Sequence, residues 1–328
     1  MTSSSLRVQV LINLLKDHGI KNIVFSPGSR NAPLVLGFNS DDFFKTHVLV
    51  DERSAAFVAL GIAQQEEEPV IICSTSGSAV LNYSPALAEA FYQKIPIIAI
   101  TADRPPEWVN HGEGQSMNQK NVFQNFVASS FNLPMLDHPD ALWQAGIMIN
   151  EAIHKASTKT KPVHINFPFR EPLYKSATNN IKKARKVSLI NTTYQIPNEE
   201  LNGLAKNWNN SSKKMIICGS LKPNKELNRL LNIINKDKNV AILTETTSNI
   251  FSNSFISCID RTLERIGTDP NFIPEIIITI GNSIISKKIK TLLRKYNPIH
   301  HWHIEKSDRA QDVFSSLTHL IPTSPESF

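Results

Sequence analysis

The chain has 328 residues, which exceeds one typical domain and is enough for two. Its 35 Lys and Arg against 29 Asp and Glu leave a formal charge of +6, and 41% hydrophobic with 20% charged residues is typical of a globular chain, not a disordered one. Three scattered cysteines suit neither a disulfide framework nor a zinc site, and they favour a reducing, cytoplasmic compartment. No apolar run reaches the roughly 18 residues of a membrane span, and the first residues lack a secretory pattern.

The excess positive charge is gathered in three short runs, at residues 182–186, 213–214 and 287–295. Such runs are usually solvated surface. No aromatic residues alternate with them in a stacking pattern, so we expect no nucleic-acid partner.

The first half of the chain alternates short β-branched runs with helical patterns. Apolar residues recur at helical spacing over residues 6–18, after Ser5 and before Gly19, which predicts a capped helix. A continuous apolar run at 69–74 predicts a strand buried on both faces. Strands are predicted over residues 22–26, 47–50, 69–74, 96–101 and 162–167, and helices over 6–18, 53–65, 79–92 and 140–156. This alternation predicts a doubly wound, mostly parallel sheet.

A polar, basic stretch without clean periodicity follows, and the same alternation then restarts. Strands are predicted over residues 214–219, 240–244, 276–281 and 300–305, and helices over 223–234 and 287–296. We therefore expect two α/β domains, at residues 1–175 and 196–328, joined by a linker at 176–195.

Ligands of open parallel sheets bind beyond the carboxyl ends of the strands, where this chain has unusual loops. The first loop is SPGSRNAP (26–33), in which Gly28 permits close backbone approach, Ser29 can cap a helix and Arg30 offers a fork for a carboxylate or phosphate. A plain strand-to-helix turn is the alternative interpretation.

Two further loops follow neighbouring predicted strands. VDERSAAF (50–57) places Glu52 just before an Ala-rich helix, where a lone carboxylate is more often simply solvated. STSGSAV (74–80) is a turn of small residues that could cradle a ligand with its backbone N–H groups or merely be tight. Neither a Walker loop nor a GxGxxG motif occurs in the chain.

TADRPPEW (101–108) presents Arg104 at the end of a buried strand, and HGEGQSMNQ (111–119) is a polar loop that contains Gln115. The alternative for Arg104 is a structural ion pair with Asp103 or Glu107. Because all these loops converge on one end of one sheet, a shared site is favoured over five unrelated turns.

A metal site at the three histidines His300, His301 and His303 is not expected. On a strand, His301 and His303 share one face and His300 points away, and no cysteine or carboxylate pair lies at a ligand spacing nearby. Cys73 lies in a predicted buried strand and is interpreted as a small hydrophobic residue, not a nucleophile.

The ordered motifs SPGSRNAP, DERSAAF, TSGSAV, ITADRPPE and GQSMNQ closely resemble the amino-terminal part of the 2-succinyl-5-enolpyruvyl-6-hydroxy-3-cyclohexene-1-carboxylate synthases, thiamine diphosphate enzymes of menaquinone biosynthesis. The resemblance covers residues 1 to about 175 strongly and continues more weakly through GNSIISKK (281–288). It implies a pyrimidine-binding domain followed by a central domain. The family's third, diphosphate-binding domain carries a GDG motif that is absent here, so we expect a fragment that is inactive alone.

The resemblance also implies roles for individual residues. Glu52 matches the glutamate that hydrogen-bonds a pyrimidine nitrogen and so favours the form that can take the thiazolium proton. The implied cofactor-binding residues are Pro27, Gly28, Glu52, Thr75, Ser76 and Gly77. The implied substrate-binding residues are Ser29, Arg30, Arg104, Gln115, Lys287 and Lys288.

The implied reaction decarboxylates 2-oxoglutarate and adds the succinyl semialdehyde unit to isochorismate. The implied cofactors are thiamine diphosphate and Mg2+ or Mn2+, with the metal and diphosphate held outside this chain, and the family's sites between subunits imply at least a homodimer. Two positions depart from many relatives: Lys288 replaces an arginine of some relatives and cannot offer the same fork, and Gly114 replaces an asparagine. A standalone two-domain binding protein and another thiamine enzyme, such as acetolactate synthase, remain alternatives.

Overall fold

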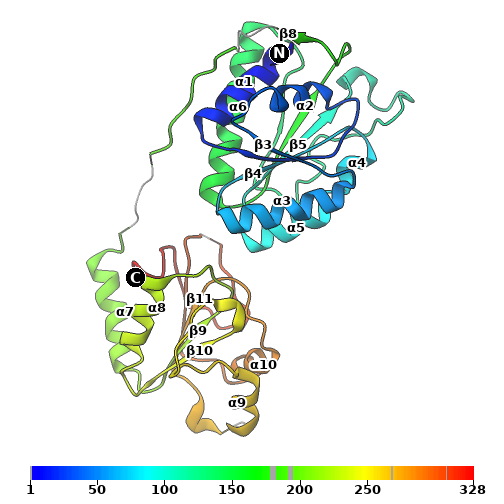
Figure 1. Ribbon diagram of the computed structural model, residues 1–328. Helices are drawn as coiled ribbons and strands as arrows, with labels where there is room; N and C mark the ends of the chain where they lie inside the picture. Colours follow the sequence, from blue (N-terminus) through cyan, green and yellow to red (C-terminus); the bar gives the residue numbers. More distant parts are fainter. Residues whose placement is uncertain (1, 178–181, 191–194, 267–268, 308) are drawn as a thin grey trace. The chain divides into compact units, whose positions relative to one another are not determined.

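In a computed structural model, the structure describes residues 2–177, 182–190, 195–266, 269–307 and 309–328. The chain divides into two compact units, Met1–Ile190 and Asn191–Phe328, and each is described by itself. Both carry a parallel sheet with helices on its two faces, so the predicted α/β fold class is confirmed (Figure 1). In the described part of the chain no helix is both long enough and apolar enough to cross a membrane.

The first unit is built on six parallel strands in the order β3-β2-β4-β5-β7-β6. These strands are β2 (Asn22–Phe25), β3 (Lys45–Val48), β4 (Val70–Ser74), β5 (Ile97–Asp103), β6 (Ser130–Asn132) and β7 (Val163–Pro168). A short antiparallel pair, β1 (Thr2–Ser3) and β8 (Ser176–Ala177), joins the two ends of the unit. The central strands β4 and β5 are buried throughout, because their continuous apolar runs face helices on both sides.

Two groups of helices cover the two faces of this sheet (Figure 1). The helices α1 (Leu6–Asp17), α2 (Ala32–Asn39) and α6 (Pro139–Lys159) share one apolar core with the sheet. The opposite core is formed with α3 (Glu52–Glu66), α4 (Ser78–Leu81) and α5 (Ser84–Gln93). A short 3-10 helix, η1 (Pro106–Trp108), follows β5.

The prediction of a single helix over residues 79–92 is wrong. Two helices, α4 and α5, occupy this stretch, and Asn82 and Tyr83 separate them. The second helix starts afresh because Pro85 has no N–H to donate and fits a first helical turn. This break matters for the site, since it leaves Asn82 at the end of α4.

Part of the predicted linker lies on the first unit. The backbone N–H groups of Lys182, Ala184 and Val187 donate to the side chains of Gln9, Asn13 and Asn150 at 2.9, 2.8 and 2.9 Å. These acceptors lie on α1 and α6, so three hydrogen bonds hold residues 182–187 against the two helices.

The second unit has five parallel strands in the order β10-β9-β11-β12-β13. The strands are β9 (Lys214–Cys218), β10 (Val240–Thr244), β11 (Ile276–Ile280), β12 (His300–Ile304) and β13 (His319–Ile321). Helices α7 (Asn198–Asn210) and α8 (Lys225–Ile234) pack on one face, and α9 (Ile259–Ile266) and α10 (Lys287–Tyr296) on the other. Two 3-10 helices, η2 (Thr246–Ser248) and η3 (Pro270–Phe272), lie in the loops.

Candidate functional site

A polar cavity of about 460 Å³ opens at the carboxyl edge of the first sheet. The chain leaves β2 toward β3 on one side and reaches β4 on the other, so the strand order reverses between β2 and β4. A reversal of this kind leaves a crevice between the loops that follow the two strands. The cavity is lined by Pro27, Gly28, Ser29, Glu52, Thr75, Ser78, Ala79, Asn82 and Gln115.

The two loops of the crevice touch at Gly28 and Thr75. A Cβ atom added to Gly28 would lie 2.4 Å from the Cβ of Thr75, closer than side-chain atoms approach. Residue 28 must therefore be glycine for the two loops to lie this close together. This is the close backbone approach expected from the sequence. Ser29 lines the cavity but does not cap α2, because Asn31 occupies the N-cap position.

Glu52 enters the cavity from the first turn of α3. The helix begins here because the side chain of Asp51 accepts a hydrogen bond from the N–H of Ser54 at 2.7 Å. That hydrogen bond holds the pKa of Asp51 below its ordinary value.

Two buried groups of this unit, the thiol of Cys73 and the phenol of Tyr83, are poor candidates for chemistry at neutral pH. Burial raises the pKa of the Cys73 thiol to about 12, in agreement with its interpretation as a hydrophobic residue. Burial likewise raises the pKa of the Tyr83 phenol, and the negative charge of Glu52 contributes in the same direction. Both groups therefore stay protonated, and Glu52 is the titratable side chain that lines the cavity.

The turn after β4 is fixed by contacts with the 111–119 loop. Gly77 has φ +81°, and a Cβ atom there would meet the backbone of Gln115 at 3.0 Å. The Ser76 hydroxyl donates to the carbonyl of Gln115 at 3.0 Å, and the Gly77 N–H donates to Oε1 of Gln119 at 2.9 Å. Ser76 and Gly77 thus shape the cavity from behind, whereas Thr75 and Gln115 line it.

Arg30 points away from the cavity lining and is almost wholly buried. Its Nη1 donates to the carbonyl of Phe169 at 3.1 Å, and its Nη2 lies 3.5 Å from a carboxylate oxygen of the exposed Glu171. Among the described residues its Nε has no hydrogen-bond partner. Burial lowers the pKa of Arg30, and the nearby positive charge of Arg104 lowers it further, so the two arginines are electrostatic neighbours.

Arg104 forms no ion pair with Asp103 or Glu107, the structural alternative considered for it. Its Nε and Nη2 donate to the carbonyl of Gly114 at 3.2 and 2.7 Å, and its Nε lies 3.6 Å from Glu113. Glu107 instead pairs with Arg170. Gly114 contributes a backbone carbonyl, a contact that does not depend on the side chain at this position.

Three cavity residues were missed from the sequence: Ser78, Ala79 and Asn82. Asn82 was missed because the sequence predicted one continuous helix over residues 79–92. The signal that could have revealed it is Pro85, because a proline in the middle of a helical pattern marks a new helix start.

The remaining predicted residues, Lys287 and Lys288, lie in the second unit at the start of α10. The Ser286 hydroxyl caps this helix, and Nζ of Lys288 lies 3.1 Å from Glu264. The reversal of strand order in this unit falls between β9 and β11, but the loops there pack on each other. A Cβ atom on Gly219 would lie 2.3 Å from the carbonyl oxygen of Asn282.

The histidines of β12 are part of a hydrogen-bonded core. His301 Nε2 and His303 Nδ1 both lie within hydrogen-bond distance of the Thr279 hydroxyl, at 3.1 and 2.9 Å, so the two rings share a face as expected. Burial lowers the pKa of His301 to about 4. Within the ranges that the structure describes, no group of three or more His, Cys, Asp or Glu could hold a metal ion.

Comparison with known proteins identifies the class of the first unit. Residues 7–124 match the family described as "Thiamine pyrophosphate enzyme, N-terminal TPP binding domain". The matched range ends just beyond the 111–119 loop and contains every cavity residue. Residues 7–124 are therefore similar to the N-terminal domain of thiamine pyrophosphate enzymes.

Curated relatives extend the similarity over nearly the whole chain. The chain is 44% identical over 322 residues to 2-succinyl-5-enolpyruvyl-6-hydroxy-3-cyclohexene-1-carboxylate synthase of Flavobacterium psychrophilum, and 43% identical over 326 residues to that of Flavobacterium johnsoniae. It is 39% identical over 323 residues to the synthase of Porphyromonas gingivalis. Each alignment covers 98% of this chain but 57, 57 and 56% of the relative. These matches confirm the resemblance to the synthase family, and the chain spans a little over half the length of these relatives.

Proposed function

We propose that this chain forms the pyrimidine-binding and central domains of a 2-succinyl-5-enolpyruvyl-6-hydroxy-3-cyclohexene-1-carboxylate synthase, a transferase of menaquinone biosynthesis. The intact protein would decarboxylate 2-oxoglutarate and add the remaining succinyl semialdehyde unit to isochorismate in the cytoplasm. The observation that carries this proposal is Glu52, which begins a helix beside a polar cavity at the strand-order reversal of a thiamine pyrophosphate-binding domain. The similarity to the named synthases supports the choice of reaction.

The donor set of the cavity fits the aminopyrimidine part of thiamine diphosphate. A flat heterocycle with ring nitrogens and an amino group needs a carboxylate, amide or hydroxyl groups, and a backbone that lets it approach. Glu52, Asn82, Gln115 and the hydroxyls of Thr75 and Ser78 provide the polar groups. These groups support our proposal that the cavity holds this half of the cofactor.

The diphosphate and its Mg2+ or Mn2+ need a different donor set. Divalent cations of this kind prefer several carboxylate and carbonyl oxygens. The part of the chain that the structure describes contains no such group of His, Cys, Asp or Glu. We propose that the metal and the diphosphate bind outside this cavity, whose lining contains a single carboxylate, that of Glu52.

The chain's own residues have separate tasks in this scheme. When bound, thiamine diphosphate supplies an electron sink for the decarboxylation of a 2-oxo acid. Glu52 would share a proton with a pyrimidine nitrogen, and Pro27, Gly28, Ser76 and Gly77 would shape the wall against the ring. A carboxylate in the first turn of α3 is suited to this proton-holding task because the helix fixes the position of its backbone at the cavity.

Substrate carboxylates would be recognised by cations and polar side chains. Both substrates are dicarboxylates, and Arg30 and Arg104 are electrostatic neighbours on the loops after β2 and β5. We propose that Arg104, with Ser29 and Gln115 at the cavity, binds isochorismate or 2-oxoglutarate. Arg30 would add to the positive charge around Arg104. Lys287 and Lys288 are proposed to contribute cationic contacts from the central domain.

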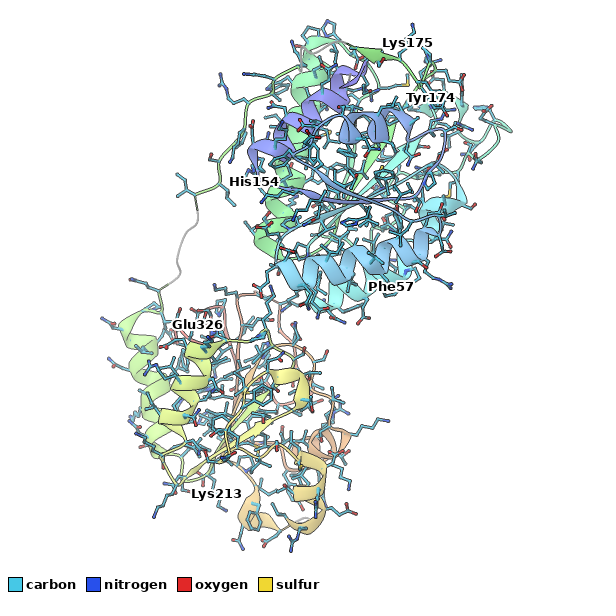
Figure 2. All side chains as sticks on the ribbon, in the orientation of Figure 1. Phe57, His154, Tyr174, Lys175, Lys213 and Glu326 are labelled. Carbon is cyan, nitrogen blue, oxygen red and sulfur yellow. The ribbon has the colours of Figure 1, made fainter. Side chains whose placement is uncertain are left out.

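We further propose that the protein is at least a homodimer. The outer faces of α3, α4 and α5 carry large apolar side chains that are exposed to solvent in the single chain. Phe57 (labelled in Figure 2), Val58, Leu81 and Tyr92 are 44, 40, 46 and 62% exposed. Two of these helices border the cavity, α3 through Glu52 and α4 through Ser78 and Ala79. A second copy that covers this face would therefore also close the cofactor site.

The experiment that tests the proposed function is Glu52→Gln in the full-length protein. The substitution preserves size and removes the negative charge, so exchange of the thiazolium proton of bound thiamine diphosphate for deuterium should slow by about a hundredfold or more. Glu66→Gln, at the exposed far end of the same helix, is the matched control and should leave the exchange rate unchanged. An unaltered rate in Glu52→Gln would remove Glu52 from this role.

A further inference from the structure

The turn that shapes the cavity and the loop that carries Arg104 are joined by a buried network of amides. Gln119 is 1% exposed, and both its amide donors and its carbonyl oxygen form hydrogen bonds. Its Oε1 accepts from the N–H of Gly77 at 2.9 Å, and its Nε2 donates to the carbonyl of Ala102 and to Oδ1 of Asn166, both at 3.0 Å. One side chain thus connects the loop after β4 to the ends of β5 and β7.

Asn166 continues the connection to the Arg104 loop. Its Nδ2 donates to Oδ2 of Asp103 at 2.7 Å, and Oδ1 of the same carboxylate accepts from the backbone N–H of Arg104 at 2.7 Å. Nδ2 also donates to Oδ1 of Asn132 at 2.7 Å. Asn166 is 2% exposed and Asp103 is 5% exposed, so water does not compete for these bonds.

The orientation of Asn166 is determined by a second chain of hydrogen bonds. The Thr101 hydroxyl donates to Oδ1 of Asn166 at 3.0 Å, so it accepts from Nε2 of His164 at 2.8 Å. His164 Nδ1 then accepts from the Ser130 hydroxyl at 3.0 Å. Burial lowers the pKa of His164 to about 3, and a neutral ring with its proton on Nε2 satisfies every bond in the chain.

We propose that Gln119 is a positioning residue, which with Asn166 sets the cofactor-side turn Thr75–Ser78 and the Arg104 loop relative to each other. It lines no part of the cavity and so would touch neither ligand. The inference rests on the proposed function for the identity of the two ligands, but the physical link between the loops does not. A fully satisfied buried network of this kind has a single arrangement, and loss of one member leaves several buried groups unpaired.

The link itself is tested by hydrogen–deuterium exchange in the full-length protein. Gln119→Met keeps the length of the side chain and removes all three hydrogen bonds, so deuterium uptake should rise in both segments 75–81 and 103–114. Gln9→Met is the matched control, because Gln9 is 2% exposed and its amide bonds the carbonyl of Ser3 and the N–H of Lys182, away from the cavity. Unchanged uptake in either of the two segments of Gln119→Met would overturn the proposal.

The consequence for binding is tested with the same proteins. Gln119→Met should weaken thiamine diphosphate–Mg2+ binding and raise the KM for isochorismate, each by about tenfold. Gln119→Glu keeps the acceptor for Gly77 but places an oxygen against Ala102 and Asn166, so it should raise the KM for isochorismate more than it weakens cofactor binding. If both variants lose only melting temperature, as is expected of Gln9→Met, the role is merely structural. A wild-type protein that binds no thiamine diphosphate would overturn the proposed function, while the exchange data would still decide whether the link exists.

Discussion

The Cβ of Thr75 lies where a side chain on residue 28 would begin, at 2.4 Å from the Cβ position of Gly28. This single contact sets the separation of the two loops that form the floor of the cavity. Its consequence can be measured on both stability and binding.

Gly28→Ala should force the loops after β2 and β4 apart. Because Thr75 is β-branched and buried, it cannot rotate away cheaply, and we expect a loss of about 1–3 kcal/mol in the free energy of unfolding. Cofactor affinity of the full-length protein should fall with it. Chemical denaturation and calorimetric titration measure the two effects.

Gly203→Ala is the control for this experiment. Gly203 lies inside α7, and nothing approaches its Cβ position within 4 Å. Alanine should therefore stabilise the chain by up to about 1 kcal/mol. Equal stability of Gly28→Ala and the wild type would mean that the loops tolerate a wider separation than the structure shows.

Arg104→Ala in the full-length protein should raise the KM for isochorismate by about tenfold to a hundredfold, because a lost charge-assisted contact costs about 1.5–3 kcal/mol. Cofactor affinity should change little, since Arg104 does not line the cavity. Arg104→Lys retains the charge but not the two-pronged contact and should be intermediate. Kinetics for both substrates, with melting temperatures, provide the measurement.

The opposite pattern would assign Arg104 a structural role. Its contacts with Glu113 and the Gly114 carbonyl could serve only to hold the 111–119 loop. In that case melting temperature would fall while isochorismate kinetics stayed normal. Arg170→Ala, which removes the exposed pair with Glu107, calibrates the effect of losing a surface ion pair.

Residues 1–328 alone should bind thiamine diphosphate–Mg2+ weakly and show no synthase turnover. The charge of the diphosphate and the metal supplies much of the binding energy of such a cofactor, and the described residues contain no group of three or more His, Cys, Asp or Glu that could hold a metal ion. Calorimetric titration of this chain is the direct measurement. Micromolar affinity would show that the chain holds the diphosphate as well as the pyrimidine.

Stability should decrease below about pH 6.5, the ordinary pKa of histidine. Burial lowers the folded-state pKa of His164 to about 3 and of His301 to about 4, so below pH 6.5 the unfolded chain binds protons that the folded chain does not. The stability from each neutral ring is complete above pH 6.5 and is lost as pH falls toward the folded pKa. Each ring should contribute a slope of up to about 1.4 kcal/mol per pH unit.

Denaturation of the chain at pH 5, 6 and 7 checks this prediction. His164→Gln should flatten the dependence on pH in the first unit, whatever its effect on stability at pH 7. The exposed His138, which makes no buried contact, serves as the control in His138→Gln. An unchanged slope in His164→Gln would show that another group titrates.

The strands were predictable where their burial is simple. Residues 70–74 and 97–103 are buried on both faces, and continuous apolar runs such as PVIICS and PIIAIT betray this directly. The three-residue strand Ser130–Asn132 was missed because its short, mixed sequence has no period to detect. The docking of residues 182–187 was missed for another reason: their backbone bonds the side chains of α1 and α6, which no local pattern encodes.

The loops of the candidate site were predictable, but the direction of their side chains was not. Small residues and glycines after β2 and β4 marked the crevice. The place of Glu52 before a helix favoured a merely solvated carboxylate, and its role was predicted only from the family resemblance. Arg30 and Arg104 lie on those predicted loops, yet Arg30 turns toward the carbonyl of Phe169, 139 residues later in the chain. Such a partner depends on the tertiary packing of β7 beside β5, so the sequence around Arg30 does not reveal it.

The network around Gln119 has a consequence for behaviour in salt. Six of its seven linked side chains are neutral at physiological pH, those of Ser130, His164, Thr101, Asn166, Asn132 and Gln119, and the seventh, Asp103, is almost completely buried. Dissolved ions screen exposed charges far more than buried dipoles. Added salt should therefore leave the shape of the cofactor cavity intact while it weakens attraction between Arg104 and an anionic substrate, so ionic strength separates the two tasks that this network holds together.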